Sequence, residues 1–187
     1  MSMHPGTTSA QSSFVEDRLA IVNLFAAYAH FANVGDIDGW ANCFTSDATY
    51  AVSAPRAPGI PLPIAQVVAA ETPQFAAYRR MLDDPDSGER KIYCIVNPYV
   101  VTQDASSASI VCELVQLRAQ PTGPAPRIQL TGTYSGDLVK RDGEWRIFRW
   151  AISTTRQPES VSEVPALWWL NVAASKDGDW RAPAEQA

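Results

Sequence analysis

Hydrophobic residues in the first half of the chain recur every three or four positions, the spacing of one helix face. Val15, Leu19, Val22 and Phe25 follow this spacing and predict a helix over residues 14–33. The polar, small-residue segment before it, residues 1–13, is predicted to be a disordered tail. The chain therefore begins its folded part with one long amphipathic helix.

Two further helices follow from capping residues and apolar spacing. Gly35 is expected to end the first helix, and Asp36 can cap a short second helix over residues 37–44. A third amphipathic helix is predicted over residues 64–81, after a proline-rich loop that no helix interior or central strand would tolerate. All three predicted helices lie in the first half of the chain.

The second half alternates in the manner of β-strands. Residues 47–53 form a first predicted strand. Four longer segments, rich in Val, Ile, Tyr and Trp, follow at residues 91–102, 107–119, 127–140 and 144–156. Short polar turns separate them, and Asp142 and Gly143 make the clearest hairpin turn. A meander of antiparallel hairpins is the simplest topology.

This order of elements predicts an α+β fold. The three N-terminal helices would pack in a strongly curved antiparallel sheet, forming a conical barrel with an internal cavity. The domain is expected to span residues 14–157. Residues 158–187 would form an irregular C-terminal extension that packs on the domain or on an oligomer.

Composition narrows the class of protein. The net charge is −5 and the Lys and Arg residues are scattered, which argues against a nucleic-acid partner. No apolar run approaches the length of a membrane span, and the N-terminus lacks the features of a signal peptide. The three cysteines are widely spaced and are read as buried free thiols. These features predict a cytoplasmic protein that acts on neither membranes nor nucleic acid.

A polar cluster on the first helix is the main candidate for chemistry. Tyr28, His30 and Asn33 interrupt an otherwise apolar segment that runs from Leu24 to Tyr50. Such a cluster is typical of a lined pocket, of a dimer seam or of a satisfied hydrogen bond in the core. His30 has the intrinsic pKa of a proton-transfer group, and it shares a helical face with Asn33. The chain has only two histidines and no clustered carboxylates, so no metal site is expected. It also lacks a phosphate-binding loop, so no nucleotide cofactor is expected.

The chain resembles the SnoaL-like group of the nuclear-transport-factor-2-like superfamily through three groups of residues. They are Tyr28 with Asp36, Asp38, Trp40, Phe44, Asp47 and Ala48; the strand sequence of residues 93–98; and Gly132 and Tyr134 followed by residues 141–147. The resemblance implies a conical α+β fold that forms dimers or trimers through the outer sheet face. Its members include dehydratases, dehydrochlorinases, polyketide cyclases, isomerases and non-catalytic dioxygenase subunits, so fold alone does not choose a function.

The resemblance also implies an Asp/His proton-transfer pair, and this chain departs from it. The Asp position falls on Asn33 and the His position on Tyr93. A pocket arginine of some relatives falls on Trp150, while an aromatic lining position is kept as Tyr50. The scaffold is therefore expected without the usual pair.

The candidate site residues follow from these considerations. His30 is expected to move a proton, while Tyr50, Tyr93 and Asn33 would bind an oxygen on which charge develops. The expected substrate-binding residues are Tyr28, Trp40, Glu113, Phe148 and Trp150. Glu113 is also a secondary candidate for a base, because a buried carboxyl group has a raised pKa, and Glu71 ranks behind it. Each of these side chains could instead serve only packing or capping.

Two functions remain open at this point. The first is a cofactor-independent lyase, isomerase or cyclase that acts on a hydrophobic, oxygenated small molecule in an enclosed pocket. The second is a non-catalytic ligand-binding protein, or a structural small subunit, because Asn33 and Tyr93 replace the usual pair. The expected partners are a small hydrophobic ligand and further copies of the chain in a homodimer or homotrimer, whereas a structural subunit would copurify with a large partner.

Overall fold

The computed structural model describes residues 6–55, 58–84, 89–120 and 124–155, with side chains from Ser13 onward. The expected C-terminal extension lies outside the described residues. The three helices are α1 (Gly6–Val34), α2 (Ile37–Ala41) and α3 (Ile64–Asp83). Helix α1 begins before the expected start at residue 14, so it takes in part of the segment predicted to be disordered.

The junction between α1 and α2 forms as the sequence predicts. Gly35 has a φ of +69°, the left-handed conformation that ends a helix and that glycine adopts without a Cβ clash. The Asp36 carboxylate accepts a hydrogen bond from the Gly39 amide at 2.9 Å and caps α2. Helix α2 is shorter than predicted, because Phe44 already belongs to the first strand.

Six strands form one sheet in the order β2-β1-β6-β5-β4-β3. Their bounds are β1 Phe44–Ser53, β2 Leu62–Pro63, β3 Arg90–Gln103, β4 Ser107–Ala119, β5 Arg127–Arg141 and β6 Glu144–Thr154. Strands β3 to β6 form the predicted antiparallel meander. The hairpin turn at Asp142 and Gly143 has positive φ at both residues, as a tight two-residue turn requires.

The predicted barrel differs from the structure in two respects. Strand β1 pairs with β6 in parallel, so the sheet is mixed rather than antiparallel throughout. The sheet is also open, since β2 and β3 are its two edges and do not pair with each other. Parallel strands need a long connection between them. Helix α3 and strands β2 to β5 all lie between β1 and β6 in the sequence, so this requirement is met.

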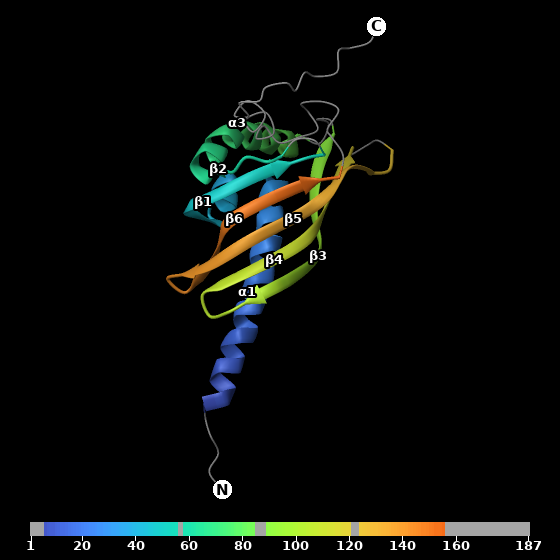
Figure 1. Cartoon of the computed structure of the whole chain (residues 1–187). Helices are drawn as coiled ribbons and strands as arrows, with labels where there is room; N and C mark the ends of the chain where they lie inside the picture. Colours follow the sequence, from blue (N-terminus) through green and yellow to red (C-terminus); the bar gives the residue numbers. More distant parts are fainter. Residues whose placement is uncertain (1–5, 56–57, 85–88, 121–123, 156–187) are drawn as a thin grey trace.

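The helices lie on one face of the open sheet, where the core is found. Figure 1 shows α1 crossing this face and projecting beyond the sheet, with α3 near the β2 edge. Phe25 and Ile21 of α1 are fully buried against it, and Ile147 of β6 is also fully buried. This arrangement leaves a hollow between α1, α3 and the sheet.

Candidate functional site

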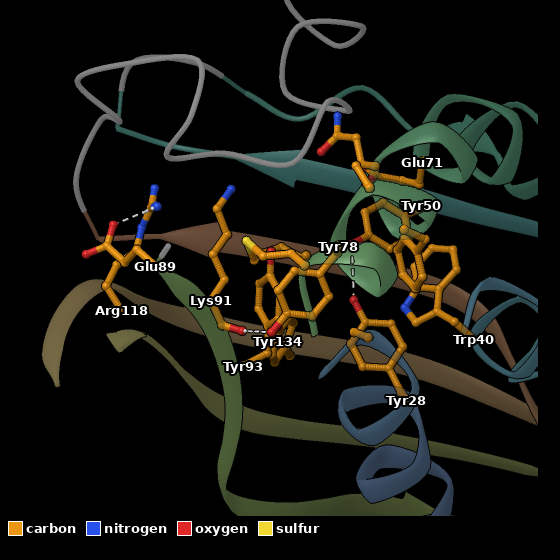
Figure 2. A pocket seen from close by; sticks show the side chains of 16 residues that line it. Tyr28, Trp40, Tyr50, Glu71, Tyr78, Glu89, Lys91, Tyr93, Arg118 and Tyr134 are labelled. Carbon is orange, nitrogen blue, oxygen red and sulfur yellow. Dashed lines mark hydrogen bonds and ion pairs between the residues drawn. The ribbon is translucent and has the colours of Figure 1, made fainter. Parts of the chain in front are cut away.

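The hollow is a pocket of about 400 Å³, lined by α1, α2, α3 and five of the six strands (Figure 2). Its walls are mainly aromatic and aliphatic, and a few polar side chains project into it. A mostly apolar concave site with a few convergent polar groups is typical of small-molecule binding.

Two phenol groups meet in the buried part of the pocket. The hydroxyl oxygens of Tyr28 on α1 and Tyr50 on β1 lie 3.1 Å apart, and either can donate the hydrogen bond (Figure 2). Tyr28 also packs edge-on against the Tyr134 ring and tilted against the Trp40 ring. All four residues are buried, with at most 4% of their surface exposed. The hydroxyl pair is therefore fixed by rigid aromatic neighbours.

Burial keeps these phenols protonated. Removal from water raises the pKa of Tyr28, Tyr50 and Tyr134 well above the ordinary value. The same effect raises the pKa of Tyr93, which lines the pocket from β3. At neutral pH these hydroxyl groups can donate hydrogen bonds to a ligand oxygen, which is the property required to stabilise developing negative charge.

A buried carboxyl group also lines the pocket. Glu71 on α3 has only 6% of its surface exposed and lies beside Tyr50 in Figure 2. Its negative charge adds to the rise in pKa of both Tyr50 and Tyr93. Glu71 ranks behind Glu113 as a sequence candidate, because helical periodicity alone does not show which face of α3 meets a cavity.

Charged side chains gather at the other end of the pocket. The Arg118 guanidinium lies 2.9 Å from a carboxylate oxygen of Glu89, and Lys91 lies nearby (Figure 2). The Tyr78 hydroxyl donates to the Lys91 carbonyl at 2.6 Å and so connects α3 to the start of β3. The pocket thus has a polar, charged end and an aromatic end. None of these four residues was a sequence candidate.

His30 does not lie where the sequence analysis expected it. Its side chain is exposed, contacts the ring of Phe31, and is not among the residues that line the pocket. His30 follows the buried pair Tyr28 and Ala29 directly, but its side chain lies outside the buried face of α1. The expectation that His30 points inward is wrong, because the apolar stripe of α1 is too narrow to include it.

Asn33 has a different role from the one expected. Its side-chain amide donates to the Tyr93 carbonyl at 2.9 Å, and its side-chain oxygen accepts from the Tyr93 amide at 2.8 Å. Asn33 is not among the pocket-lining residues, so it binds strand β3 rather than a ligand oxygen. The predicted neighbours Asn33 and Tyr93 do lie together, through the Tyr93 backbone.

Glu113 and Phe148 lie away from the pocket. Glu113 is exposed, on the sheet face opposite the buried Cys112 and Leu114, so the inward placement allowed by the alternation is wrong. Phe148 is half-buried and stacks with the guanidinium groups of Arg141 and Arg149. Neither is a pocket-lining residue.

A β-bulge explains the position of Phe148. The β5–β6 register pairs Leu138 with Ile147 and Asp137 with Arg149, which leaves Phe148 as an extra residue. An extra residue reverses the alternation of a strand beyond it. Ile147 and Trp150 are consequently both buried although they are three positions apart.

The two predicted tryptophans are both buried. Trp40 lines the pocket from α2, as expected. Trp150 packs against Phe25, Tyr28 and Tyr134, with ring centroids 4.6–5.0 Å apart, and lies behind the pocket wall. Trp150 therefore supports the tyrosines from behind and does not line the pocket.

The described part of the chain contains no group of three His, Cys, Asp or Glu side chains arranged to hold a metal ion. None of its helices combines the length and apolar character needed to cross a membrane. The polar groups that line the pocket include phenols, the Glu71 carboxyl group and the charged residues at the other end.

Residues 13–151 match the family model of the SnoaL-like domain, and the chain belongs to this family. The comparison with curated proteins finds no match. The resemblance inferred from the sequence is confirmed by this match, which spans most of α1, all of α2 and α3, and nearly all of the sheet.

Solved structures show the same fold at low identity. A nuclear-transport-factor-2-like protein with a cystatin-like fold from Novosphingobium aromaticivorans is 17% identical, with a TM-score of 0.64 over 87% of this chain and 96% of that one. The β subunit of a protein assigned as an aromatic-ring-hydroxylating dioxygenase, from the same organism, is 17% identical, with a TM-score of 0.60 over 84% and 98%.

A third similar structure is a protein assigned as a scytalone dehydratase, also from Novosphingobium aromaticivorans. It is 17% identical, with a TM-score of 0.53 over 78% of this chain and 88% of that one. Identities this low establish the fold alone, and the matching structures range from a protein assigned as a dehydratase to a dioxygenase subunit.

Proposed function

We propose that this protein is a cofactor-independent enzyme of the lyase, isomerase or cyclase type. Its substrate would be a hydrophobic, oxygenated small molecule held in the pocket between α1, α3 and the sheet. The observation that carries the proposal is the Tyr28–Tyr50 hydroxyl pair, which lies in a buried aromatic pocket of about 400 Å³. A carbonyl oxygen placed there would accept hydrogen bonds from groups that remain protonated.

The pocket would act by excluding water and by supplying hydrogen-bond donors to the ligand. Aromatic walls exclude water and fix the shape of the ligand, which lowers the cost of reaching a reactive geometry. Since one hydroxyl of the Tyr28–Tyr50 pair donates to the other, the pair keeps one hydrogen that can be donated to an oxygen that gains negative charge during the reaction, and Tyr93 can supply a second donor. His30 and Asn33 take no part in this proposal, because both lie outside the pocket.

A non-catalytic role is the second candidate. A structural subunit has no need of an open cavity, whereas this chain keeps one lined by charged and phenolic groups. The cavity therefore favours a role that binds a small molecule. A binding protein without turnover remains the alternative, and it shares the same pocket. In either case we expect a homodimer or homotrimer that associates through the uncovered sheet face.

The proposal can be tested by identifying a bound compound and then measuring its turnover after one hydroxyl group has been removed. Native mass spectrometry of the freshly purified protein would identify a retained compound, which is then used as the substrate. Tyr50→Phe is expected to lower its turnover by about 100-fold to 1,000-fold, the usual effect of losing one oxyanion donor. The control is Ser46→Ala, which removes a hydroxyl from an exposed residue of the same strand that does not line the pocket.

The outcomes separate the two candidates. A retained compound that the wild-type protein binds but does not convert would favour the binding protein. Conversion that Tyr50→Phe leaves unchanged would contradict the role proposed for the hydroxyl pair.

A further inference from the structure

Three cationic side chains lie in a row at the charged end of the pocket. In the strand register, Lys91 of β3 lies directly opposite Arg118 of β4, and Arg118 lies directly opposite Arg127 of β5. Residues directly opposite one another on antiparallel strands project from the same face of the sheet. Lys91 and Arg118 line the pocket, so the whole row lies on the face that the pocket occupies.

This cation row, Lys91, Arg118 and Arg127, is unfavourable without negative charge beside it, because like charges directly opposite one another repel. One oxygen of the Glu89 carboxylate lies 2.9 Å from Arg118, and the other lies 3.2 Å from Arg127. A single carboxylate shared between two guanidinium groups leaves this group of three side chains net positive, although the chain as a whole has a net charge of −5. The cation row therefore gains from a further anion beside it.

The Arg118 guanidinium is held in a fixed orientation. Its Nε donates to the Gln129 side-chain oxygen at 2.6 Å, and its Nη1 donates to Glu89 at 2.9 Å. The Arg118 side chain is only 14% exposed, so water and salt screen its charge weakly. A guanidinium has five N–H donors in one plane, so it can bond Gln129, Glu89 and a ligand oxygen at the same time.

The cation row faces the aromatic part of the pocket. Figure 2 shows Arg118 and Lys91 at one end of the pocket and Tyr50 at the other. Tyr93 lies between these ends; burial raises its pKa, and the charge of Arg118 opposes that rise. A ligand that spans the pocket would therefore meet cations at one end, aromatic rings along its length and the phenol pair at the far end.

We propose that the cation row binds a carboxylate of the ligand, so that the substrate class is hydrophobic, oxygenated molecules that carry an acid group. This inference rests on the function proposed above and adds a charged group to the substrate described there. Directly opposite residues have Cβ atoms roughly 5 Å apart, so the long side chains of Lys91 and Arg118 can converge on the two oxygens of one carboxylate. Arg127, which is 74% exposed, adds its charge from the rim.

A carboxylate bound in this way also fixes the direction in which the ligand lies. Its charged end stays with the cation row, and its apolar body is placed among the aromatic rings, where a charge would lose its hydration without a partner. The oxygen at the opposite end of the ligand then lies toward the Tyr28–Tyr50 hydroxyl pair. The cation row is thus a specificity determinant, separate from the groups that act on the reacting oxygen.

Two probes of the same shape can test the preference for an anion. In 2-naphthoate the naphthalene ring carries a carboxylate, and in 2-naphthamide it carries a neutral amide. Isothermal titration calorimetry at neutral pH measures the Kd of each probe. The wild-type protein is expected to bind naphthoate at least about tenfold more tightly, because hydrogen bonds to charged groups are worth more than neutral ones. Added salt should weaken the binding of naphthoate and leave that of naphthamide nearly unchanged.

Lys91→Gln removes one charge of the cation row without removing the bonds of Arg118 to Gln129 and Glu89. It is expected to weaken naphthoate binding about tenfold and to leave the Kd of naphthamide unchanged. The matched control is Arg149→Gln, which removes a positive charge from an exposed position on β6 that does not line the pocket. Both Kd values should remain those of the wild type in this control.

Arg118→Gln should show the same selective loss as Lys91→Gln. This variant also loses the bonds to Gln129 and Glu89, so circular dichroism and thermal unfolding must first establish that it is folded. If it does not fold, Lys91→Gln and the salt dependence of the wild-type protein decide the question.

Failure of this inference can be distinguished from failure of the proposed function. Equal Kd values for the two probes, or equal weakening of both by Lys91→Gln, would overturn the anion site and leave the pocket as a ligand site. Absence of binding by either probe would overturn the pocket as a site for aromatic ligands, and the anion site with it. Selective binding of naphthoate, combined with no turnover of a retained compound, would support the anion site in a binding protein and contradict the enzyme.

Discussion

At the scale of single residues, Asp17 shows how one oxygen atom can hold a helix on a sheet. Its Oδ1 accepts hydrogen bonds from the Lys140 ammonium at 2.6 Å and from the Trp145 indole at 3.0 Å. Trp145 is buried, so its N–H would otherwise lie in the core without this partner. The two donors hold the pKa of Asp17 below its ordinary value of 3.8.

Replacing Asp17 with asparagine should therefore destabilise the protein in a pH-dependent way. Asn keeps an acceptor oxygen but lacks the charge, and a charged hydrogen bond is worth more than a neutral one by about 1 kcal/mol. Because the folded state lowers the pKa of Asp17, its contribution is complete above pH 3.8 and is lost as the pH falls below that value. Urea unfolding at pH 7 and at pH 3 would measure both effects.

The difference between the wild-type protein and Asp17→Asn should thus narrow at pH 3. Glu113→Gln is the control, since it removes one negative charge from an exposed position on the sheet. An Asp17→Asn effect of equal size at both pH values would show that the charge on Asp17 contributes nothing to stability.

Single side chains in the pocket could be predicted from the sequence only in part. Tyr28, Trp40, Tyr50 and Tyr93 line the pocket as expected. Glu71 was underrated because a lone carboxyl group on an amphipathic helix is usually solvated. His30 was wrongly placed in the pocket because residues three positions apart on a helix point in directions that differ around the helix axis, so the spacing to Asn33 does not fix where the His30 side chain lies.

At the scale of elements, Asn33 joins the end of α1 to strand β3. Its side chain forms a donor and an acceptor bond with the backbone of Tyr93, at 2.9 and 2.8 Å. Only an amide side chain can make both bonds, because a carboxylate has no hydrogen to donate. This explains why Asn suits the structure at a position where the resemblance implies an acid.

Asn33→Asp should destabilise the protein by about 1–3 kcal/mol, because the carboxylate loses the bond to the Tyr93 carbonyl and faces it with a negative charge. Urea unfolding at pH 7 measures the loss. Gln120→Glu is the matched control, since it makes the same chemical change at an exposed position. If Asn33→Asp were as stable as this control, the two hydrogen bonds would not be what attaches α1 to β3.

Strand positions were predicted better than strand faces. The bounds of β3 to β6 agree with the sequence to within two residues at each end, because polar turns separate long β-branched and aromatic segments. The bulge at Phe148 could not be anticipated, since nothing in the local sequence marks an extra residue. Once it is known, the outward position of Phe148 and the inward position of Trp150 follow.

At the scale of the whole molecule, the two faces of the sheet have different surroundings. The helices and the pocket occupy one face, and no described element covers the other (Figure 1). The order of elements was enough to predict the α+β class. The open edge and the parallel β1–β6 pair were not predictable, because they depend on contacts between segments about a hundred residues apart.

The uncovered face carries exposed apolar side chains along β3. Val96, Tyr99 and Val101 have 37%, 64% and 48% of their surface exposed, while Val100 between the last two is buried toward the core. Contiguous exposed apolar surface of this kind commonly marks a site of protein association. The partner we expect is a second copy of the same chain, as the resemblance implies.

Replacing Tyr99 and Val101 together with lysine should weaken self-association at least about tenfold, because like charges would then meet across the contact. Sedimentation velocity over a range of protein concentrations measures the shift toward the monomer. Leu19→Lys is the control, since it adds a charge in place of an apolar residue that is 61% exposed on α1 rather than on the sheet. The fold should be unaffected, because both substituted side chains point away from the core. A wild-type protein that sediments as a monomer, or a double variant that associates as the wild type does, would show that this face is not the contact between copies.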